Sequence, residues 1–343
     1  DSGALFAGWI RECLTLGPRP VFMNQMLFSF DFSLFDLCGA LALGGLCVLC
    51  PRETIADPEA FVRYLADNGV QVWASTPAFV RQQFLNDDFN EAHLPRLKAF
   101  VFGAESLSPA MAEQLWERFP SARIINSYGP TEATCSTTWV EIERPLTGAR
   151  NPLPIGRAKP YAEVFLDDGE ICVAGDHVMR GYFGRPDLTA QSLFLHNGKR
   201  AYRTGDIGEI DDNGLVYFHG RRDDQIKLNG YRIELGEVDA ALTGLNGVHA
   251  AATIALRRPD GTLIRMIGFV STPKALDPGV LGPLPPTLSD WKQQLGERLP
   301  PYMIPSELVA CGQFPTSVSD KVDRKRLEAL YREANMRPLK EKT

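Results

Sequence analysis

Short apolar runs alternate with amphipathic segments over the first 150 residues of the chain. The runs have the length and the β-branched or aromatic content of strands, and they cover residues 46–50, 70–75, 97–103 and 122–126. Between them, apolar side chains recur at the spacing of one helix face in residues 58–69 and 109–120. Strands that alternate with helices predict a parallel sheet covered by helices. Within this part, the apolar stretch 37–50 predicts a close-packed helix followed by a buried strand.

The pattern changes from about Pro154 onwards, where short apolar runs are separated by Gly, Asp and Asn turns. This texture predicts a small antiparallel or barrel-like unit that ends near Arg222. The remainder mixes the two patterns, with helices expected in 233–245 and 288–300, strands in 251–258 and 264–272, and a Pro-rich loop in 276–287. We therefore expect an α/β body over residues 1–222, consisting of a β/α layer (1–150) and a β-rich unit (151–222), and a small α+β domain over residues 223–343.

Composition and charge narrow the classes of partner. With 343 residues, of which 44% are hydrophobic and 23% charged, the chain can bury a large core. The formal net charge of −6 gives no electrostatic reason to expect nucleic acid or an anionic membrane surface. No stretch reaches the roughly 18 apolar residues of a membrane span, so we expect no membrane insertion. The seven irregularly spaced cysteines form neither a disulfide framework nor a zinc motif, which favours a reducing, cytoplasmic location.

One polar stretch directly follows an expected strand. Residues 126–139 read NSYGPTEATCSTTW, with several hydroxyls and a single carboxylate, Glu132. Loops that follow strands are where α/β enzymes keep their chemistry. A hard cation near a phosphate needs an oxygen ligand, which Glu132 can provide. Taken by itself, however, the stretch can also be a polar turn that Gly129-Pro130 introduces.

Several further motifs occur together with this stretch in a fixed order. They are FSFDFS (28–33), NSYGPTEAT (126–134), GEICVAGDHVMRGYFGRPDLT (169–189), YRTGDIG (202–208), GRRDDQIKLNGYRIELGEVD (220–239) and KVDRK (321–325). Together they resemble the amino-acid adenylation domains of the adenylate-forming superfamily, over essentially the whole chain. Residues 22–36, 70–79 and 299–305 look closest to the D-alanine–carrier-protein ligases and similar activators of small amino acids.

The resemblance implies a fold, a reaction and partners. The fold would be the adenylate-forming enzyme fold, represented here in part, with a mobile C-terminal domain. The enzyme would be a ligase that uses ATP and Mg²⁺ to join a small amino acid to AMP. It would then transfer the aminoacyl group to the phosphopantetheine thiol of a peptidyl or acyl carrier protein. Chemistry of this kind depends mainly on positioning and on the neutralisation of charge.

The resemblance also implies roles for individual residues at the nucleotide. Thr131 would donate a hydrogen bond to the α-phosphate, Glu132 would ligate Mg²⁺, and Lys321 would bridge the substrate carboxylate and the α-phosphate. Asp206 would accept the ribose hydroxyls beside Arg221. KVDRKR can equally be the basic start of a surface helix, and Ser319-Asp320 replaces the family's usual Asn-Gly before the lysine. The full set expected at the nucleotide is Gly103, Ala104, Asn126, Ser127, Tyr128, Gly129, Thr131, Asp206 and Arg221.

Two further positions would serve the movement of the C-terminal domain. Asp223 falls where the family places its hinge, and Gly230 would lie at the pantetheine tunnel, where a missing side chain lets a backbone approach. A solvated run of charges is the alternative interpretation of Arg221 to Asp224.

Asp31 is the residue that bears most on the substrate. It interrupts an apolar stretch, and a buried carboxylate needs a partner, which the α-ammonium of an amino acid would supply. The other pocket positions implied by the resemblance are mostly small, which favours alanine of either hand, then glycine or serine. The D-alanine ligases carry a cysteine at the position of Gly103. These other positions are Phe32, Phe35, Ala74, Val101, Gly103, Ser127, Cys135 and Ser136.

The chain also departs from the family. The N-terminal portion that carries the pyrophosphate-binding loop does not precede Asp1, and the segment around residues 166–173 is short. We therefore expect the 343 residues alone to adenylate poorly. The alternatives are an acyl- or aryl-CoA synthetase of the same fold, against which Asp31 argues, and a truncated non-catalytic module that binds nucleotide or a carrier.

Overall fold

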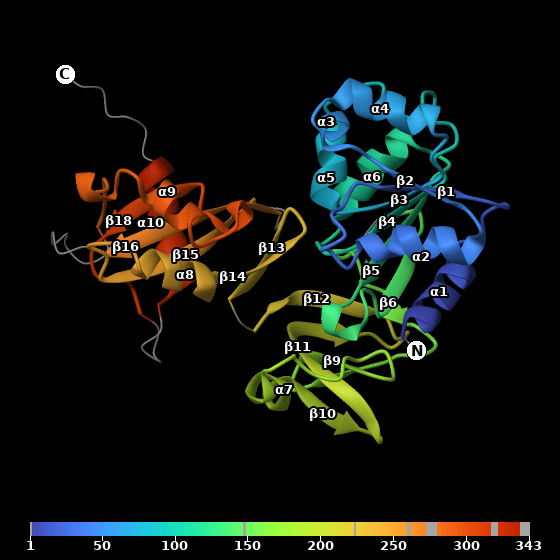
Figure 1. The fold of residues 1–343 in the computed structure, drawn as a ribbon. Coiled ribbons are helices and arrows are strands. Elements are labelled where there is room, and N and C mark those ends of the chain that lie inside the picture. The colour runs from blue at the N-terminus through green and yellow to red at the C-terminus, as the bar shows by residue number, and fades with distance from the viewer. Residues whose placement is uncertain are drawn as a thin grey trace. The chain divides into compact units, whose positions relative to one another are not determined.

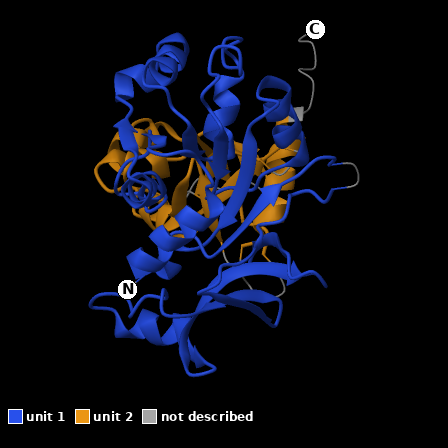
Figure 2. Cartoon of the chain, turned by 90° about the vertical axis from the view of Figure 1, so that its right-hand side faces the viewer, with its two compact units in different colours: residues 1–222 blue, residues 223–343 orange. Residues whose placement is uncertain are grey.

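The computed structural model describes residues 2–146, 149–222, 224–258, 262–271, 280–316 and 322–336. The chain divides into two compact units, residues 1–222 and residues 223–343, which are coloured separately in Figure 2. Unit 1 contains two of the sheets and most of the predicted site residues. Unit 2 contains a sheet of its own, a short hairpin and its own hydrophobic core.

A seven-stranded sheet forms the centre of unit 1, in the order β2-β1-β3-β4-β5-β6-β7. The first five strands of this order are mutually parallel, while β6 and β7 are antiparallel to their neighbours. The expected parallel sheet is therefore confirmed, with an antiparallel edge. Its strands are β1 (Val21–Asn24), β2 (Leu46–Leu49), β3 (Val72–Ser75), β4 (Ala99–Phe102), β5 (Arg123–Tyr128), β6 (Thr138–Ile142) and β7 (Arg157–Ala158).

Helices cover both faces of this sheet (Figure 1). Helices α1 (Ser2–Cys13) and α2 (Ser33–Leu43) pack on one face, and α4 (Pro58–Asp67), α5 (Pro77–Gln83) and α6 (Pro109–Arg118) on the other, with the short α3 (Arg52–Ile55) beside α4. Helices α4, α5 and α6 begin with the same sequence signal. Each begins with proline after an Asp, Thr or Ser whose side chain accepts a hydrogen bond from a backbone N–H of the first turn.

Strand β2 differs from the expectation for the stretch 37–50. The helix forms as α2 and ends at Gly44, which adopts a left-handed φ of 62°. The strand, however, lies at the edge of the sheet, and Leu46 is 62% exposed and Leu49 55% exposed. The expectation of a buried strand was therefore wrong. An apolar run of this length looks the same in sequence whether its neighbours cover it or not.

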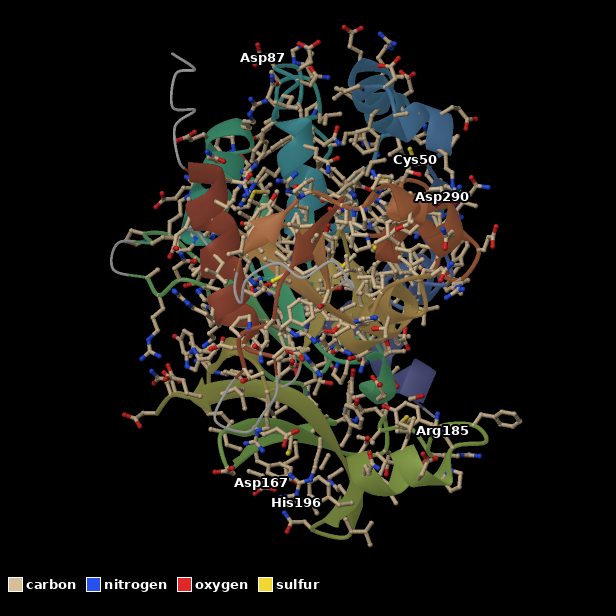
Figure 3. All side chains as sticks on the ribbon, turned by 90° about the vertical axis from the view of Figure 1, so that its left-hand side faces the viewer. Cys50, Asp87, Asp167, Arg185, His196 and Asp290 are labelled. Atoms are coloured by element: carbon tan, nitrogen blue, oxygen red, sulfur yellow. The ribbon has the colours of Figure 1, made fainter. Side chains whose placement is uncertain are left out.

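The β-rich part of unit 1 forms an antiparallel sheet in the order β10-β11-β9-β8. Strand β12 also pairs with β11. The elements of this part are β8 (Glu163–Asp167), β9 (Glu170–Ala174), α7 (Pro186–Ser192), β10 (Leu193–His196), β11 (Lys199–Ile210) and β12 (Val216–Arg221). The short segment noted in the sequence is the tight β8–β9 hairpin, where Asp168 and Gly169 both have positive φ. Asp167 and His196 in this sheet are labelled in Figure 3, and the His196 ring stacks on Phe165 at 3.8 Å between centroids.

Unit 2 is an α+β domain around a four-stranded sheet in the order β15-β16-β18-β17. Helices α8 and α9 pack on one face of this sheet and α10 on the other. The two-residue strand β17 lies inside the expected Pro-rich loop because it pairs with β18. The elements are β13 (Gln225–Leu228), β14 (Tyr231–Glu234), α8 (Leu235–Thr243), β15 (Ala250–Arg257), β16 (Leu263–Ser271), β17 (Leu281–Gly282), η2 (Pro286–Leu288), α9 (Trp291–Gly296), η3 (Pro301–Met303), β18 (Glu307–Cys311) and α10 (Arg324–Met336).

The cysteines behave as small apolar side chains. All seven are free, and burial raises the pKa of the Cys13 thiol to about 12 and that of the Cys172 thiol to about 11. A thiol with so high a pKa stays protonated and unreactive at neutral pH. In the described ranges, no helix combines the length and the apolar character needed to cross a bilayer.

Candidate active site

The carboxyl ends of the parallel strands bring several predicted pocket residues together. Ala74 on β3 is the register partner of Val101 on β4, which in turn pairs with Ile125 on β5. These three side chains are fully buried and share one face of the sheet. Gly103 and Ala104 follow β4 directly, and Ser127 is the next residue after Ile125 on the same face of β5. Crevices at the carboxyl ends of parallel strands are where α/β proteins bind ligands.

Phe32 occupies the space beside Gly103. A Cβ atom added at Gly103 would lie 2.9 Å from Cζ of Phe32, closer than real Cβ atoms come to a ring. The ring of Phe32 also packs against that of Phe35, with centroids 6.2 Å apart. Both rings are buried. The absence of a side chain at position 103 is therefore what allows Phe32 to lie at this edge of the sheet.

The NSYGPTEAT stretch forms the end of β5 and a strained connection to β6. After the short 3₁₀ helix η1 (Thr131–Ala133), the consecutive residues Thr134 and Cys135 have φ values of 57° and 65°. Left-handed backbone is costly for residues other than glycine and persists only where the surroundings enforce it. The connection folds back tightly, since a Cβ atom at Gly129 would lie 2.7 Å from Cα of Ser136.

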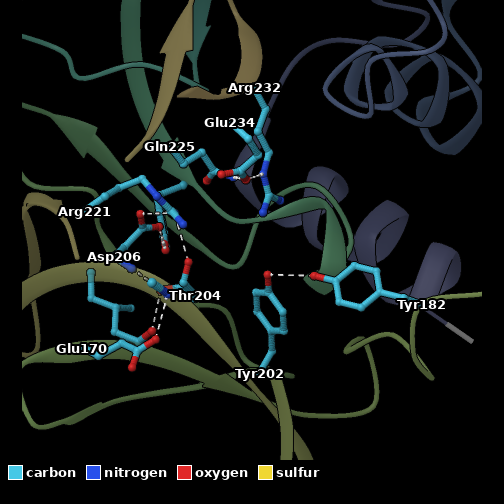
Figure 4. A network of polar contacts seen from close by, with 12 residues as sticks. Glu170, Tyr182, Tyr202, Thr204, Asp206, Arg221, Gln225, Arg232 and Glu234 are labelled. Carbon is cyan, nitrogen blue, oxygen red and sulfur yellow. Dashed lines mark hydrogen bonds and ion pairs between the residues drawn. The ribbon is translucent and has the colours of Figure 1, made fainter. Parts of the chain in front are cut away.

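Glu132 is held in place by a tyrosine that the sequence analysis did not identify. The carboxylate is buried, and its Oε1 atom accepts a hydrogen bond of 2.7 Å from the hydroxyl of Tyr182, 50 residues away along the chain. The Tyr182 hydroxyl also lies 3.3 Å from that of Tyr202 (Figure 4). Tyr182 belongs to the motif 169–189, but its spacing from Glu132 gives no signal in sequence. Thr131, next to Glu132, is exposed.

The residues around Glu132 suit a magnesium ion that is bound mainly through phosphate. The described ranges contain no group of three or more His, Cys, Asp or Glu side chains that could hold a metal. Mg²⁺ is usually held by one or two carboxylates together with substrate phosphates and water, rather than by a protein cage. A single oriented carboxylate at Glu132 fits that pattern.

Asp31 lies in the turn before α2 and is half-buried, not fully buried as the sequence suggested. The difference arises because Asp31 follows an exposed turn, residues 27–29, and precedes the part of α2 that packs on the sheet. The Asp31 carboxylate nevertheless lies near the strained connection. Together with burial, which is the larger cause, its charge raises the pKa of the Cys135 thiol.

Asp36 is the fully buried carboxylate of this region, and the sequence analysis missed it. Its Oδ2 atom accepts a hydrogen bond of 3.3 Å from Asn24, while Oδ1 has no hydrogen-bond partner in the described part of the chain. Burial raises the pKa of Asp36 well above its usual range. The signal in the sequence was a second Asp in the same apolar run, five residues after Asp31.

Asp206 and Arg221, the predicted ribose residues, form a connected network with Tyr128. Asp206 accepts a hydrogen bond of 2.6 Å from Nη1 of Arg221 (Figure 4). It also accepts one of 2.5 Å from the Tyr128 hydroxyl. Its backbone N–H donates to Oγ1 of Thr204. Burial, and then the charge of Asp206, raise the pKa of Tyr128 well above its usual range. Both carboxylate oxygens are thus already engaged.

The side chains of Asn126 and Ser127 bond to neighbouring backbone. Nδ2 of Asn126 donates to the carbonyl of Pro154 at 2.8 Å, and Oγ of Ser127 donates to the carbonyl of Phe102 at 2.9 Å. These bonds tie the end of β5 to its surroundings. A structural role therefore stands beside the predicted contact with nucleotide for both residues.

The three predicted residues beyond position 222 belong to unit 2. Asp223 and Lys321 lie outside the described residues. Gly230 and Asn229 form the two-residue turn of the β13–β14 hairpin, with φ values of 84° and 51°. A turn with two positive φ values favours Asn-Gly, so the hairpin alone accounts for a glycine at this position. Asp224, which follows the predicted hinge residue, forms an ion pair of 2.9 Å with Arg324 at the start of α10.

Comparison with known proteins agrees with this geometry. A family model described as AMP-binding enzyme matches residues 3–183. A D-alanine--D-alanyl carrier protein ligase from Bacillus licheniformis is 37% identical over 341 residues, which cover 96% of this chain and 66% of that protein. The chain thus spans slightly less than two thirds of that relative's length.

Solved structures share the fold. The crystal structure of IdnL1 aligns with a TM-score of 0.79 and 28% identity, covering 92% of this chain and 65% of that one. The Vibrio cholerae adenylation domain AlmE, solved in complex with glycyl-adenosine-5'-phosphate, aligns with a TM-score of 0.83 over 97% of this chain and 62% of that one. At 24% identity this second likeness concerns the fold alone. The chain belongs to the AMP-binding enzyme family.

Proposed function

We propose that the natural polypeptide that carries this sequence activates a small amino acid with ATP and Mg²⁺ as aminoacyl-AMP. The aminoacyl group is then transferred to the phosphopantetheine thiol of a carrier protein. The names of the curated relatives support this reaction, since the Bacillus licheniformis protein is a D-alanine--D-alanyl carrier protein ligase. The residues of unit 1 support it independently, through the placement of two carboxylates.

One observation carries the proposal: two carboxylates, Glu132 and Asp31, lie near the strained connection between β5 and β6. Glu132 is held there by Tyr182, and the charge of Asp31 acts on Cys135, three residues beyond Glu132. A ligand that uses both carboxylates has a cationic group, which Asp31 would bind, and a phosphate whose metal ion Glu132 would bind. An amino acid joined to a nucleotide has that arrangement of charge, whereas a fatty or aryl acid has no cationic group that could face Asp31.

Each side chain has a definite task in the proposed first step. Glu132 would hold Mg²⁺, which neutralises charge on the phosphate oxygens. Thr131 is exposed beside Glu132 and can donate a hydrogen bond to a phosphate oxygen. Asp31 binds the α-ammonium group and so orients the substrate carboxylate. Lys321 neutralises charge during the same step, and Asp206 with Arg221 binds the ribose.

The pocket residues favour a short side chain on the substrate. The Phe32 and Phe35 rings are bulky, and the space beside Gly103 is taken by Phe32. Buried Cys135 and Ser136 add small polar groups. Alanine, glycine and serine fit this combination, and alanine comes first because the relatives are named for it.

Amino-acid-dependent exchange of pyrophosphate into ATP, measured on the natural polypeptide that carries this sequence, tests the first step. We expect exchange with alanine, in one or both hands, above that with glycine and serine, and none with phenylalanine. Glu132→Gln keeps the hydrogen bond to Tyr182 possible but removes the charge, and we expect it to lower the exchange rate about 100-fold or more. Exchange that is independent of any amino acid, or unaffected by Glu132→Gln, would overturn the proposal.

The second step is tested by the choice of acceptor. Transfer of radiolabelled alanine to a phosphopantetheinylated carrier is expected, with little transfer when coenzyme A replaces the carrier. Efficient formation of an acyl-CoA product instead would favour a CoA synthetase of the same fold.

A further inference from the structure

A lysine is buried directly behind the strained connection of the candidate site. The side chain of Lys159 is 1% exposed, in the segment that follows β7. Its ammonium group donates a hydrogen bond of 2.6 Å to the backbone carbonyl of Ser136. The backbone N–H of Lys159 also donates to the carbonyl of Thr137 at 3.0 Å. Lys159 therefore contacts the connection twice, immediately after its two left-handed residues.

Aromatic rings surround the ammonium group on its other sides. Nζ lies 3.2 Å from the centroid of the Trp9 ring and 4.8 Å from that of Phe6, both on α1. Favourable contact of a cation with ring faces partly replaces the water that burial removes. These rings also form the back of the predicted pocket, because Trp9 and Phe6 each pack edge-on against Phe35. The lysine thus contacts the pocket through the Ser136 carbonyl and through the aromatic wall.

Stability does not explain a charge at this position. Burial lowers the pKa of Lys159 well below its usual range, and the described part of the chain offers its ammonium one oxygen partner, the Ser136 carbonyl. Replacement of a buried charge by an apolar side chain of similar volume is often neutral or stabilising. A methionine in this ring-lined space would bury as well without any desolvation cost. What the lysine supplies is a donor that fixes one carbonyl of a backbone that is otherwise strained.

The connection needs such restraint because its conformation is unfavourable in itself. Thr134 and Cys135 hold left-handed φ values without being glycine. Other bonds act on the first part of the connection, such as that of 2.8 Å from Oγ1 of Thr134 to the carbonyl of His177. Lys159 acts on the second part, at Ser136, where Cys135 and Ser136 meet the proposed pocket.

The geometry points to Lys159 as a positioning residue that sets the selectivity for the amino-acid side chain by clamping the Ser136 carbonyl. The part of this inference that concerns selectivity rests on the proposed function. Lys159 touches neither substrate nor nucleotide in this account. Its loss should therefore alter the amino-acid side of the site and leave the nucleotide side unchanged.

Two variants separate the hydrogen bond from the charge. Lys159→Met keeps most of the length and removes the donor, while Lys159→Gln keeps a donor without a charge. Lys199→Met, which removes an exposed lysine of β11, is the matched control. Each protein is examined by hydrogen exchange of residues 129–140. Calorimetry then measures binding of AMP and of non-hydrolysable sulfamoyl mimics of alanyl-AMP and phenylalanyl-AMP.

In Lys159→Met we expect the backbone amides of residues 134–137 to exchange about tenfold faster or more, since the hydrogen bond to the Ser136 carbonyl is lost. Binding of the alanyl mimic should weaken by about tenfold, and its advantage over the phenylalanyl mimic should narrow. AMP binding and resistance to urea should match the parent. Lys159→Gln should recover part of the loss, and Lys199→Met should show none.

Each outcome decides a separate part of the inference. Unchanged exchange of residues 134–137 in Lys159→Met would overturn the clamp, whatever the enzyme activates. Faster exchange with unchanged discrimination between the two mimics would overturn the role in selectivity. A parent protein that binds the alanyl mimic no better than AMP would overturn the proposed function instead, and the exchange data would still decide the clamp.

Discussion

The two halves of the candidate site pair their buried charges in different ways. On the side assigned to ribose, Asp206 accepts hydrogen bonds from Tyr128 and Arg221, so its carboxylate is satisfied within unit 1. On the side assigned to the amino acid, Lys159 has a single carbonyl partner, and one oxygen of Asp36 has none in the described ranges. The nearby His177 ring, also buried, has no hydrogen-bond partner at either nitrogen among those residues.

This difference separates groups that hold the fold from groups that serve a ligand. A buried ion pair with additional hydrogen bonds can be kept without loss of stability. Removal of one partner leaves the other as an unpaired buried charge. Incompletely paired buried groups lower stability and are retained for another reason. We therefore expect substitutions of the paired groups on the ribose side to reduce stability and ATP binding together. Substitutions of the incompletely paired groups on the amino-acid side should change selectivity with little loss of stability.

The largest effect on stability should come from Asp206→Ala. It leaves the largely buried guanidinium of Arg221 without its carboxylate, and breaking a buried pair in this way costs roughly 3–5 kcal/mol. Urea unfolding followed by tryptophan fluorescence should show this loss, together with a raised KM for ATP. The matched control is Asp187→Ala, which breaks the exposed pair with Arg185 and should leave the unfolding curve in place. Equal curves for the two variants would remove the distinction between the halves of the site.

The next effect depends on pH and comes from His177. Burial lowers the pKa of His177 to about 4 from an ordinary value of 6.5. As pH falls below 6.5 the unfolded chain takes up the proton first, so stability decreases between pH 6.5 and 4, by about 3 kcal/mol at most, and is fully present above pH 6.5. His177→Asn should flatten this part of the pH profile in urea unfolding.

A surface histidine serves as the control for that profile. His93→Asn removes an exposed ring, and its pH profile is compared with that of His177→Asn. If His177→Asn keeps the slope of the parent, the ring is paired in solution and the amino-acid side is better satisfied than we infer.

The smallest effect should come from the contact between Gly103 and Phe32. Gly103→Ala places a Cβ atom 2.9 Å from the Phe32 ring, and overpacking of this kind costs about 1–3 kcal/mol. Phe32→Leu removes the ring atoms that clash, so the double variant should recover most of the stability lost in Gly103→Ala. A double-mutant cycle in which the two effects simply add would show that the residues are not in contact.

The sequence predicted the frame of unit 1 well and its site less completely. Alternation of strands and helices was enough for the parallel sheet, because period and length carry that information. The exposed edge at Leu46 could not be foreseen, since order within a sheet is a long-range property. The contacts of Tyr182 and Lys159 could not be predicted for the same reason: each residue contacts the connection from a segment that is remote in sequence.

Asp31 and Asp36 show a different limit. Both interrupt one apolar run, and we predicted only the first as a buried carboxylate. The fold reverses this, because Asp31 falls in a turn and Asp36 on the covered side of α2. Burial within a helix depends on which face meets the sheet, and the uniformly apolar neighbours of Asp36 hide that face from a periodicity argument.

The central claim is that Asp31 provides the counter-ion for the ammonium group of an amino acid in an ATP-dependent reaction. Its most direct test is amino-acid-dependent pyrophosphate exchange by the natural polypeptide that carries this sequence (the parent) and by its Asp31→Asn variant. Each is assayed with alanine and with propionate, which lacks the amino group. The account predicts strong preference of the parent for alanine, and a loss of that preference in Asp31→Asn through a raised KM for alanine with an unchanged KM for ATP. Equal use of alanine and propionate by the parent, or full retention of the preference by Asp31→Asn, would contradict it.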